Sequence, residues 1–228
     1  MDNAPATDDI RAIPYFARLS DEDITHFAEH VVLRRVAARD FIIVEGDPSH
    51  GFFYLRSGKA RIFRTGPDGR EQSFRLVSPG DTFGEVPVFD RGPNPATVEA
   101  LEASEVLFFP SSAVVELVEH HPEVALPLLI HFAKRLRSFT ELVEQISLQT
   151  VPARIARYLY SLAREEGVEA PGGIIVPREV TQQDLASLVG SVREVVSRAL
   201  KVMEEDGVVE IRRREILIRD LAALRNLT

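Results

Sequence analysis

A polar and mostly basic face is predicted near the C-terminal end of the chain. Five residues at the spacing i, i+1, i+4, i+5 and i+8 would share one side of a helix: Arg193, Glu194, Ser197, Arg198 and Lys201. Arginine can bond guanine O6 and N7 together, and glutamate can accept from the amino group of cytosine. The pattern predicts a helix that reads base edges through Arg193 and Glu194. Arg198 and Ser197 would contact bases or phosphates, and Lys201 a phosphate.

The segment before this face carries signals for a preceding helix. Thr181 is a natural N-cap with Asp184 three residues later, which predicts a helix from about Gln182 to Val189. Gly190 then allows a tight turn, and two helices joined by such a turn form a helix-turn-helix. Thr181 and Gln182 could contact phosphates from the first helix, although the cap and the first turn explain them equally well.

The second helix is expected to begin after Ser191, which is three residues before Glu194, and to end at Gly207. Its buried side would be formed by Val192, Val196, Ala199 and Met203. Two simpler explanations of the polar face stay open. Glu194 could only cap its helix, and Arg198 could only pair with Glu194 one turn away. Arg193 has no such local partner.

The stretch VVEIRRREILIRD (208–220) alternates like two short strands around three arginines. It predicts a β-hairpin with a basic tip, a wing, that would meet backbone phosphate through Arg213. A solvated turn is the alternative.

A long central helix is predicted upstream, from Pro122 to about Leu148 after a short helix over 111–121. Its apolar positions follow steps of 3, 4, 3, 4 and 3: Leu129, Phe132, Leu136, Phe139, Val143 and Ile146. Such a narrow heptad stripe favours a seam between two copies of the chain, because a helix packed only on its own core shows a wider stripe. Packing on its own domain is the alternative. Thr150 or Val151 would be a hinge, and Pro152 would begin the next helix, over 152–166.

The first half of the chain reads as a β domain. After a helical opening over 8–30, short apolar runs at intervals of about ten residues alternate with Gly- and Pro-rich turns from Val31 to Phe109, which predicts a roll or sandwich. A short strand is expected at 174–176, and 169–173 is expected to be a loop. The fold class is therefore α+β, with a β-roll sensory domain over 1–110, a dimerisation helix over 111–149 and a winged helix-turn-helix over 150–228.

Composition narrows the possibilities further. The chain has 228 residues and no cysteine, which excludes disulfides, iron–sulfur clusters and thiolate zinc sites. It shows no apolar run of membrane length and no secretory signal, so we expect a cytoplasmic protein without membrane partners. The net charge of −8 arises entirely before residue 150, so a basic face on the C-terminal domain is compatible with DNA. No nucleophile–base pair, phosphate loop or metal-ligand signature points to an enzyme.

These residues resemble the Crp/Fnr superfamily of bacterial regulators over nearly the whole chain. The turn motifs E45-G46-D47, S57-G58, P79-G80-D81 and F83-G84-E85 resemble those of its β-roll, and residues 189–198 resemble its recognition helix. The resemblance implies that Arg193, Glu194 and Arg198 occupy the base-reading positions of the Crp branch, and Ser197 a contact position of the Fnr branch. It further implies a homodimer on palindromic promoter DNA, with RNA polymerase as a partner.

The resemblance places an effector pocket in the roll, with the residues Phe83, Gly84, Glu85, Ala96, Thr97 and His131. Cyclic-nucleotide members carry an arginine where this chain has Asn94-Pro95, and a buried phosphate without a cation is costly, so this ligand is disfavoured. The lack of cysteine excludes the iron–sulfur mode.

The stretch 48–69 and the arginine-less loop resemble haem-dependent nitric-oxide regulators. Haem could then be a non-covalent cofactor, with axial ligands among His26, His30, His50, His120, His121 and His131. Each histidine is also explained as a surface or packing residue. Haem, no ligand and a cyclic nucleotide stay open, as does a different class of protein: a ligand-binding module that regulates a protein partner.

Overall fold

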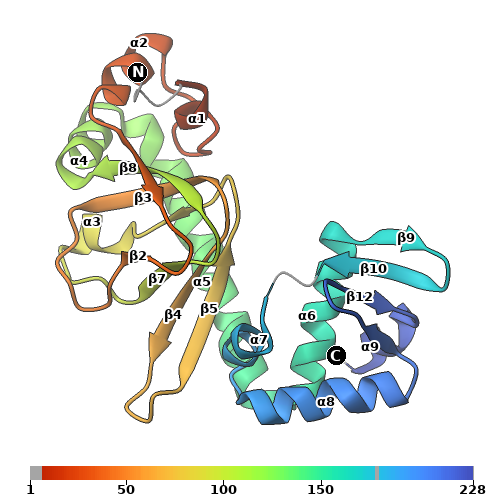
Figure 1. Ribbon diagram of the computed structural model, residues 1–228. Helices are drawn as coiled ribbons and strands as arrows, with labels where there is room; N and C mark the ends of the chain where they lie inside the picture. The colour runs from red at the N-terminus through yellow and green to blue at the C-terminus, as the bar shows by residue number, and fades with distance from the viewer. Residues whose placement is uncertain (1–6, 178–179, 228) are drawn as a thin grey trace. The chain divides into compact units, whose positions relative to one another are not determined.

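The structure is a computed structural model that describes residues 7–177 and 180–227 (Figure 1). The chain forms two compact units, one made of residues up to 64 together with 74–139, the other of 65–73 and residues from 140 onward. The division thus falls within the long helix α5 (Ala125–Leu148) and not at its ends.

The first unit opens with two short helices, α1 (Thr7–Arg11) and α2 (Asp21–Ala28). Ser20 caps α2, because its side chain accepts a hydrogen bond of 3.1 Å from the Asp23 amide. Ile24 and Phe27 of α2 are buried, so these helices close one end of a hydrophobic core.

The predicted β-roll is present and consists of two four-stranded sheets. Their orders are β1-β8-β3-β6 and β2-β7-β4-β5. The strands are β1 (Val32–Val36), β2 (Phe41–Ile43), β3 (Gly51–Ser57), β4 (Ala60–Thr65), β5 (Glu71–Val77), β6 (Thr82–Phe83), β7 (Thr97–Ala100) and β8 (Ser104–Pro110). Side chains from both sheets, including Leu55, Phe83 and Val98, form one of the cores.

Three helical segments complete this part: α3 (Val86–Asp90), α4 (Ser111–His120) and a 3₁₀ turn, η1 (Pro122–Val124), which leads into α5. Phe52 and Phe109 stack in the core beneath α4, with ring centroids 4.6 Å apart. The packing fixes the start of α5 to the roll, because Val124 and Leu128 belong to the same core.

The C-terminal unit has the predicted winged helix-turn-helix architecture. Its elements are α6 (Val151–Glu166), β9 (Val168–Ala170), β10 (Gly173–Pro177), α7 (Gln182–Leu188), α8 (Arg193–Glu205), β11 (Val209–Ile211), β12 (Glu215–Ile218) and α9 (Leu221–Leu227). The strands form one sheet in the order β11-β12-β10-β9. The fold class, α+β with a β-roll, a long helix and a winged helix-turn-helix, is confirmed.

One local prediction was wrong. Residues 169–173 were expected to form a loop, but Glu169 and Ala170 belong to β9, which pairs with β10. Gly172 allows the reversal between them, because its φ of +89° lies in the left-handed region that glycine adopts without strain. No helix in the described ranges combines the length and the apolar content needed to cross a bilayer.

Candidate functional site

The entry to the helix-turn-helix is built as the sequence predicts. The Thr181 side chain accepts from the Asp184 amide at 3.1 Å, and the Thr181 amide donates to the Asp184 carboxylate at 3.1 Å. This reciprocal capping box satisfies amides that the first turn of α7 would otherwise leave unpaired. Asp184 is buried, so these hydrogen bonds are shielded from water and hold the start of α7 in place.

The start of the second helix differs from the prediction. Ser191 does not cap it; Val192 is the N-cap residue, without a side-chain bond, and α8 begins at Arg193. The Ser191 amide instead donates to the Ala186 carbonyl at 2.8 Å and closes the turn after α7. Gly190 in this turn has a φ of +61°, as its predicted role requires. Glu194 then lies in the first turn of α8, where a negative charge is favourable.

Helix α8 separates its two faces clearly. Val196, Ala199 and Met203 are buried as predicted, together with Leu200, whereas Val192 is only half-buried. The predicted reading residues are all exposed: Arg193, Glu194, Ser197, Arg198 and Lys201. The structure therefore presents the basic side of this helix outward.

The two arginines of this face are uncommitted. Within the described part of the chain, neither Arg193 nor Arg198 has a hydrogen-bond or ion-pair partner, and the alternative pair of Arg198 with Glu194 is not formed. Lys201 pairs with Glu205 at 3.6 Å, but both side chains are exposed, so this contact contributes little. Thr181, also exposed, is engaged as the cap, and Gln182 opens α7 half-buried.

The wing divides its three arginines between two roles. Arg212 donates to Glu210 at 2.8 Å and to Glu215 at 2.7 Å, and so ties β11 to β12. Arg213 and Arg214, at the turn between the strands, are exposed. The paired arginine shapes the hairpin and leaves the next two guanidiniums facing solvent, which keeps Arg213 available for the predicted phosphate contact.

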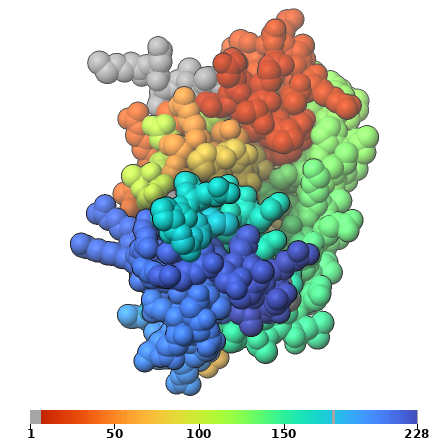
Figure 2. Space-filling model, turned by 90° about the vertical axis from the view of Figure 1, so that its right-hand side faces the viewer, coloured from red at the N-terminus to blue at the C-terminus, as the bar shows by residue number. Residues whose placement is uncertain are grey.

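The predicted seam of α5 is largely uncovered in the single chain. Large fractions of Leu129, Leu136 and Val143 are exposed (64, 70 and 62 %), and Ile146 is 38 % exposed. In Figure 2 the green atoms, which include this helix, lie along the right-hand edge of the view. An apolar strip of this kind marks an interaction surface.

Two of the predicted seam residues serve the roll as well. Phe132 is half-buried against the N-terminal core and meets Phe89 edge-on, with centroids 5.8 Å apart. Phe139 contacts Phe74 of β5 at 5.8 Å, although it is 49 % exposed. The heptad stripe predicted one seam for all six residues. The phenylalanines differ because they lie on the flank of α5 that faces the β-roll.

A partly open cavity of about 190 Å³ lies between the roll and α5. Five of the six predicted pocket residues line it: Phe83, Gly84, Glu85, Ala96 and His131. Thr97 does not, because successive side chains of a strand point to opposite faces and Ala96 and Val98 are the ones that face the cavity. The Thr97 hydroxyl instead accepts from the Glu45 amide at 3.1 Å.

The loop that lacks an arginine has a structural explanation. The Asn94 side chain donates to the Asp47 carbonyl at 3.0 Å, and the Asn94 amide donates to the same oxygen at 2.9 Å. The Gly46 amide in turn donates to the Asn94 carbonyl at 2.9 Å. Asn94 is buried and ties two turns together, so this position is occupied by a structural residue and offers no cation.

Cations do reach the cavity from two other elements. Arg75 of β5 and Arg135 of α5 both line it, and both approach one oxygen of Asp81, at 3.1 and 3.3 Å. Sequence reasoning missed this pair. The alternation of β5 and the helical period of α5 could have placed each arginine on an inner face, but their meeting depends on the tertiary packing.

A buried acid and base lie in the same cavity. The Glu85 carboxylate is 3.3 Å from His131 Nε2, and the His131 ring meets Tyr15 edge-on. Burial acts to raise the pKa of Glu85, but hydrogen bonds from His131 and Thr82 outweigh it and the pKa is lowered. Burial, reinforced by the charge of Glu85, raises the pKa of Tyr15 well above its usual value. Glu85 is therefore an anion at neutral pH.

The other candidate haem ligands lie away from this cavity. His120 contacts the Glu116 carbonyl at 2.8 Å, His121 lies near Asp23 and Glu123, and His26 is 3.6 Å from Glu29. His26 and His30 meet edge to face on α2. Among the described residues, no group of three histidine or acidic side chains could hold a metal ion. Of the six histidines, His131 alone lines the 190 Å³ cavity.

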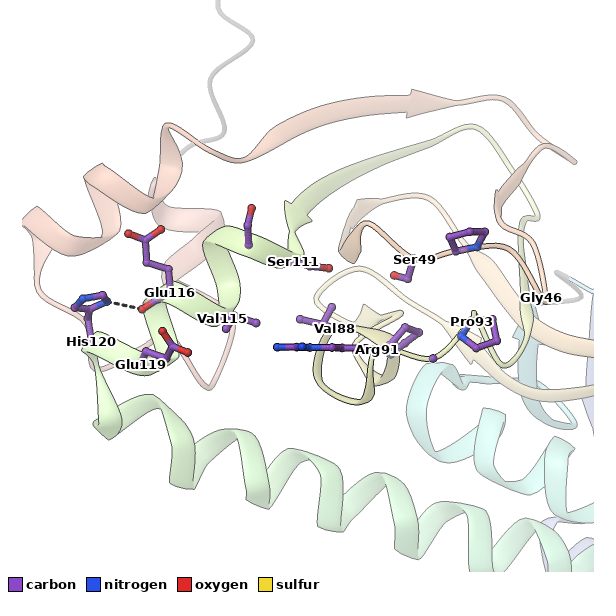
Figure 3. A pocket seen from close by; sticks show the side chains of 14 residues that line it. Gly46, Ser49, Val88, Arg91, Pro93, Ser111, Val115, Glu116, Glu119 and His120 are labelled. Carbon is purple, nitrogen blue, oxygen red and sulfur yellow. Dashed lines mark hydrogen bonds between the residues drawn. The ribbon is translucent and has the colours of Figure 1, made fainter.

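A second hollow is an open groove of about 840 Å³ beside α3 and α4 (Figure 3). Arg91 lines it, in a left-handed conformation at the end of α3, with His120 at the far end of α4. Its acidic side chains, Glu116 and Glu119, come from one exposed helix face. Arg91 thus contributes to this groove and does not line the cavity between the roll and α5.

Two family models match the chain, a cyclic nucleotide-binding domain over residues 33–121 and a Crp-like helix-turn-helix domain over residues 153–227. A CRP-like cAMP-activated global transcriptional regulator of Mycobacterium tuberculosis is 31 % identical over 179 residues, covering 78 % of this chain and 80 % of the relative. The cyclic AMP receptor protein of Thermus thermophilus is 29 % identical over 218 residues, covering 96 % and 98 %.

Solved structures agree in fold. A CRP-family transcriptional regulator of Thermus thermophilus superposes with a TM-score of 0.69 at 29 % identity, covering 85 % of this chain and 95 % of the other. The c-di-GMP responsive regulator CLP of Xanthomonas campestris superposes with a TM-score of 0.78 at 24 % identity, covering 88 % and 100 %. These matches agree with the exposed basic face of α8 and with the wing. The chain belongs to the Crp/Fnr family of transcriptional regulators.

Proposed function

We propose that the chain binds palindromic promoter DNA as a homodimer, with one α8 helix in each of two successive major grooves. The observation that carries this is the exposed and uncommitted state of Arg193 and Arg198 on α8. Arginine in the major groove reads guanine with two bonds, and each such pair contributes about 1–3 kcal/mol of discrimination. Glu194 and Ser197 complete the reading surface, with Lys201, Thr181, Gln182 and Arg213 toward the phosphates.

The dimer would form along α5, because Leu129, Leu136 and Val143 expose apolar surface that a second copy can cover. Two-fold symmetry then places the reading helices about 34 Å apart, one turn of the duplex. A cytoplasmic location and RNA polymerase as a partner fit this role.

The cavity in the roll is the proposed effector site. It borders both the β-strands and α5, so a bound molecule could favour one packing of α5 over another. A cyclic nucleotide is disfavoured here, although the mycobacterial relative is named as cAMP-activated. Asn94 offers no cation where cyclic-nucleotide members of the family carry an arginine, and the two arginines of the cavity, Arg75 and Arg135, come from other elements and approach Asp81.

Selection of binding sites from random duplexes, followed by gel shift, tests the DNA proposal. Arg193→Glu should lower the affinity for the selected palindrome by at least about tenfold, while sedimentation should show an intact dimer. Arg164→Glu, the same charge change on an exposed residue of α6, is the matched control and should bind normally. Failure to select any two-fold-symmetric site would overturn the proposal in favour of a module that regulates a protein partner.

A further inference from the structure

The volume of the partly open cavity between the roll and α5 indicates the size of molecule that fits it. An apolar cavity of roughly 150 Å³ is filled by one benzene ring. The cavity under α5, at about 190 Å³, therefore has room for one ring or a short branched chain with a small polar group. Much of its wall is apolar, from Ile43, Ile62, Phe74, Phe83 and Val98.

Two arginines of the cavity lining, Arg75 and Arg135, approach the same acidic side chain. Arg75 and Arg135 share a single carboxylate oxygen, Asp81 Oδ1, while Asp81 Oδ2 accepts from the Ser78 amide at 3.0 Å. Two guanidiniums thus face one carboxylate. Neither arginine forms the two parallel hydrogen bonds that a guanidinium can make with both oxygens of one carboxylate.

A buried acid, Glu85, lines the same cavity. Glu85 is 8 % exposed, and its Oε1 lies 3.3 Å from His131 Nε2. A second negative charge beside this buried carboxylate would be repelled. A ligand with a single acid group, held at the two arginines, is therefore favoured over a ligand with two.

We propose that the cavity binds a small monocarboxylic acid with an apolar body, whose carboxylate exchanges with Asp81 at Arg75 and Arg135. This inference rests on the proposed role of the cavity as the effector site. Because Arg135 belongs to α5 and Asp81 to the β5–β6 turn, the exchange replaces a direct bond between helix and roll by a bond through the ligand. The bound acid would then contact α5, the helix that carries the predicted dimer seam.

Calorimetric titration of the full chain tests this, with benzoate as the acid, benzamide as its neutral counterpart and inorganic phosphate as a simple anion. Benzoate should bind at least about tenfold more tightly than benzamide, because hydrogen bonds between ionised groups are stronger than those to a neutral amide. Phosphate, without an apolar body, should bind more weakly than benzoate. Arg75→Gln and Arg135→Gln should each weaken benzoate by about tenfold.

Asp81→Asn provides the decisive variant, because removal of the internal anion should tighten benzoate binding severalfold where a merely structural carboxylate would not. Arg64→Gln, at an exposed arginine outside the cavity lining, is the control and should leave the affinity unchanged. If a glutamine variant fails to fold, Arg75→Lys and the comparison of benzoate with benzamide on the unaltered chain still decide.

The inference is overturned if benzoate does not bind, if benzamide or phosphate binds as tightly, or if the arginine variants keep full affinity. The proposed function has a separate readout, the selection of a palindrome by the unliganded or benzoate-loaded chain. Specific DNA binding without benzoate binding would reject the acid alone. Benzoate binding without a palindrome would reject the DNA proposal alone.

Discussion

The Arg154 guanidinium of α6 donates to the main-chain oxygen of Ile146, near the end of α5, at 3.0 Å. The last carbonyls of a helix have no partner within it, and a cation there is favourable. Thr150 caps α6 in the same turn, by accepting from the Ala153 amide at 3.4 Å. The turn that sequence analysis treats as a hinge is thus held on both sides.

Arg154→Gln should loosen this turn without unfolding the chain. The lost charged bond should reduce the free energy of unfolding of the C-terminal unit by about 1–2 kcal/mol, and amide exchange should accelerate over residues 146–152. Hydrogen-exchange mass spectrometry measures this, with the exposed Arg164→Gln as the control. Unchanged exchange in that stretch would show that the bond does not restrain the turn.

The wing arginines should separate by role in a salt titration of DNA binding. Arg213→Ala or Arg214→Ala should weaken binding to all sequences and reduce the slope of log K against log salt by about one, because one phosphate contact is lost. Arg212→Ala should instead destabilise the β11–β12 hairpin, since it removes the bonds to Glu210 and Glu215. Equal slopes for all of these variants would contradict the proposed placement of the wing.

A charge in the α5 seam should separate the two copies. Leu136→Asp and Val143→Asp should each raise the dimer dissociation constant by at least about tenfold, because each places a carboxylate in the apolar contact twice per dimer. Sedimentation equilibrium measures the constant. Glu141→Lys lies on the outer side of the same helix by the heptad spacing and should leave the dimer intact. A variant dimer as tight as the unaltered one would locate the interface elsewhere.

Glu85 should contribute stability that depends on acid pH. Its pKa is lowered in the fold, because hydrogen bonds from His131 and Thr82 outweigh the effect of burial. The contribution of the ionised group is therefore present above about pH 4.3, the ordinary glutamate value, and is lost as the pH falls through the lowered pKa. Urea unfolding from pH 3 to 7 measures this. The free energy of unfolding of Glu85→Gln should be lower than that of the unaltered chain near neutral pH, and the two values should converge only at the acid end. Glu169→Gln, at an exposed glutamate, should show no such trend.

Local patterns predicted the capping box of α7 and the exposed polar face of α8 well. The capping box joins residues three apart, and the two faces of α8 follow from helical periodicity alone, so both were visible in the sequence. The cap of α8 was not, because Ser191 has an equally good alternative partner in the Ala186 carbonyl. Short-range spacing cannot decide between two such partners.

The charged lining of the cavity between the roll and α5 could not be predicted from the sequence. Arg75 and Arg135 are 60 positions apart and meet only through the packing of α5 on the roll. Nothing in either local sequence indicates that both approach Asp81. The sequence shows directly that Asn94 stands where an arginine was expected. That Arg75 and Arg135 line the cavity could be seen only in the folded structure.

The uncovered strip of α5, with Leu136 and Val143 at its centre, has a thermal consequence. Association through apolar surface lowers the heat capacity and weakens on cooling. Pairing of two chains along this helix should therefore loosen in the cold and strengthen on mild warming. At low copy number, the fraction of promoters occupied would then rise with temperature even at a constant amount of regulator.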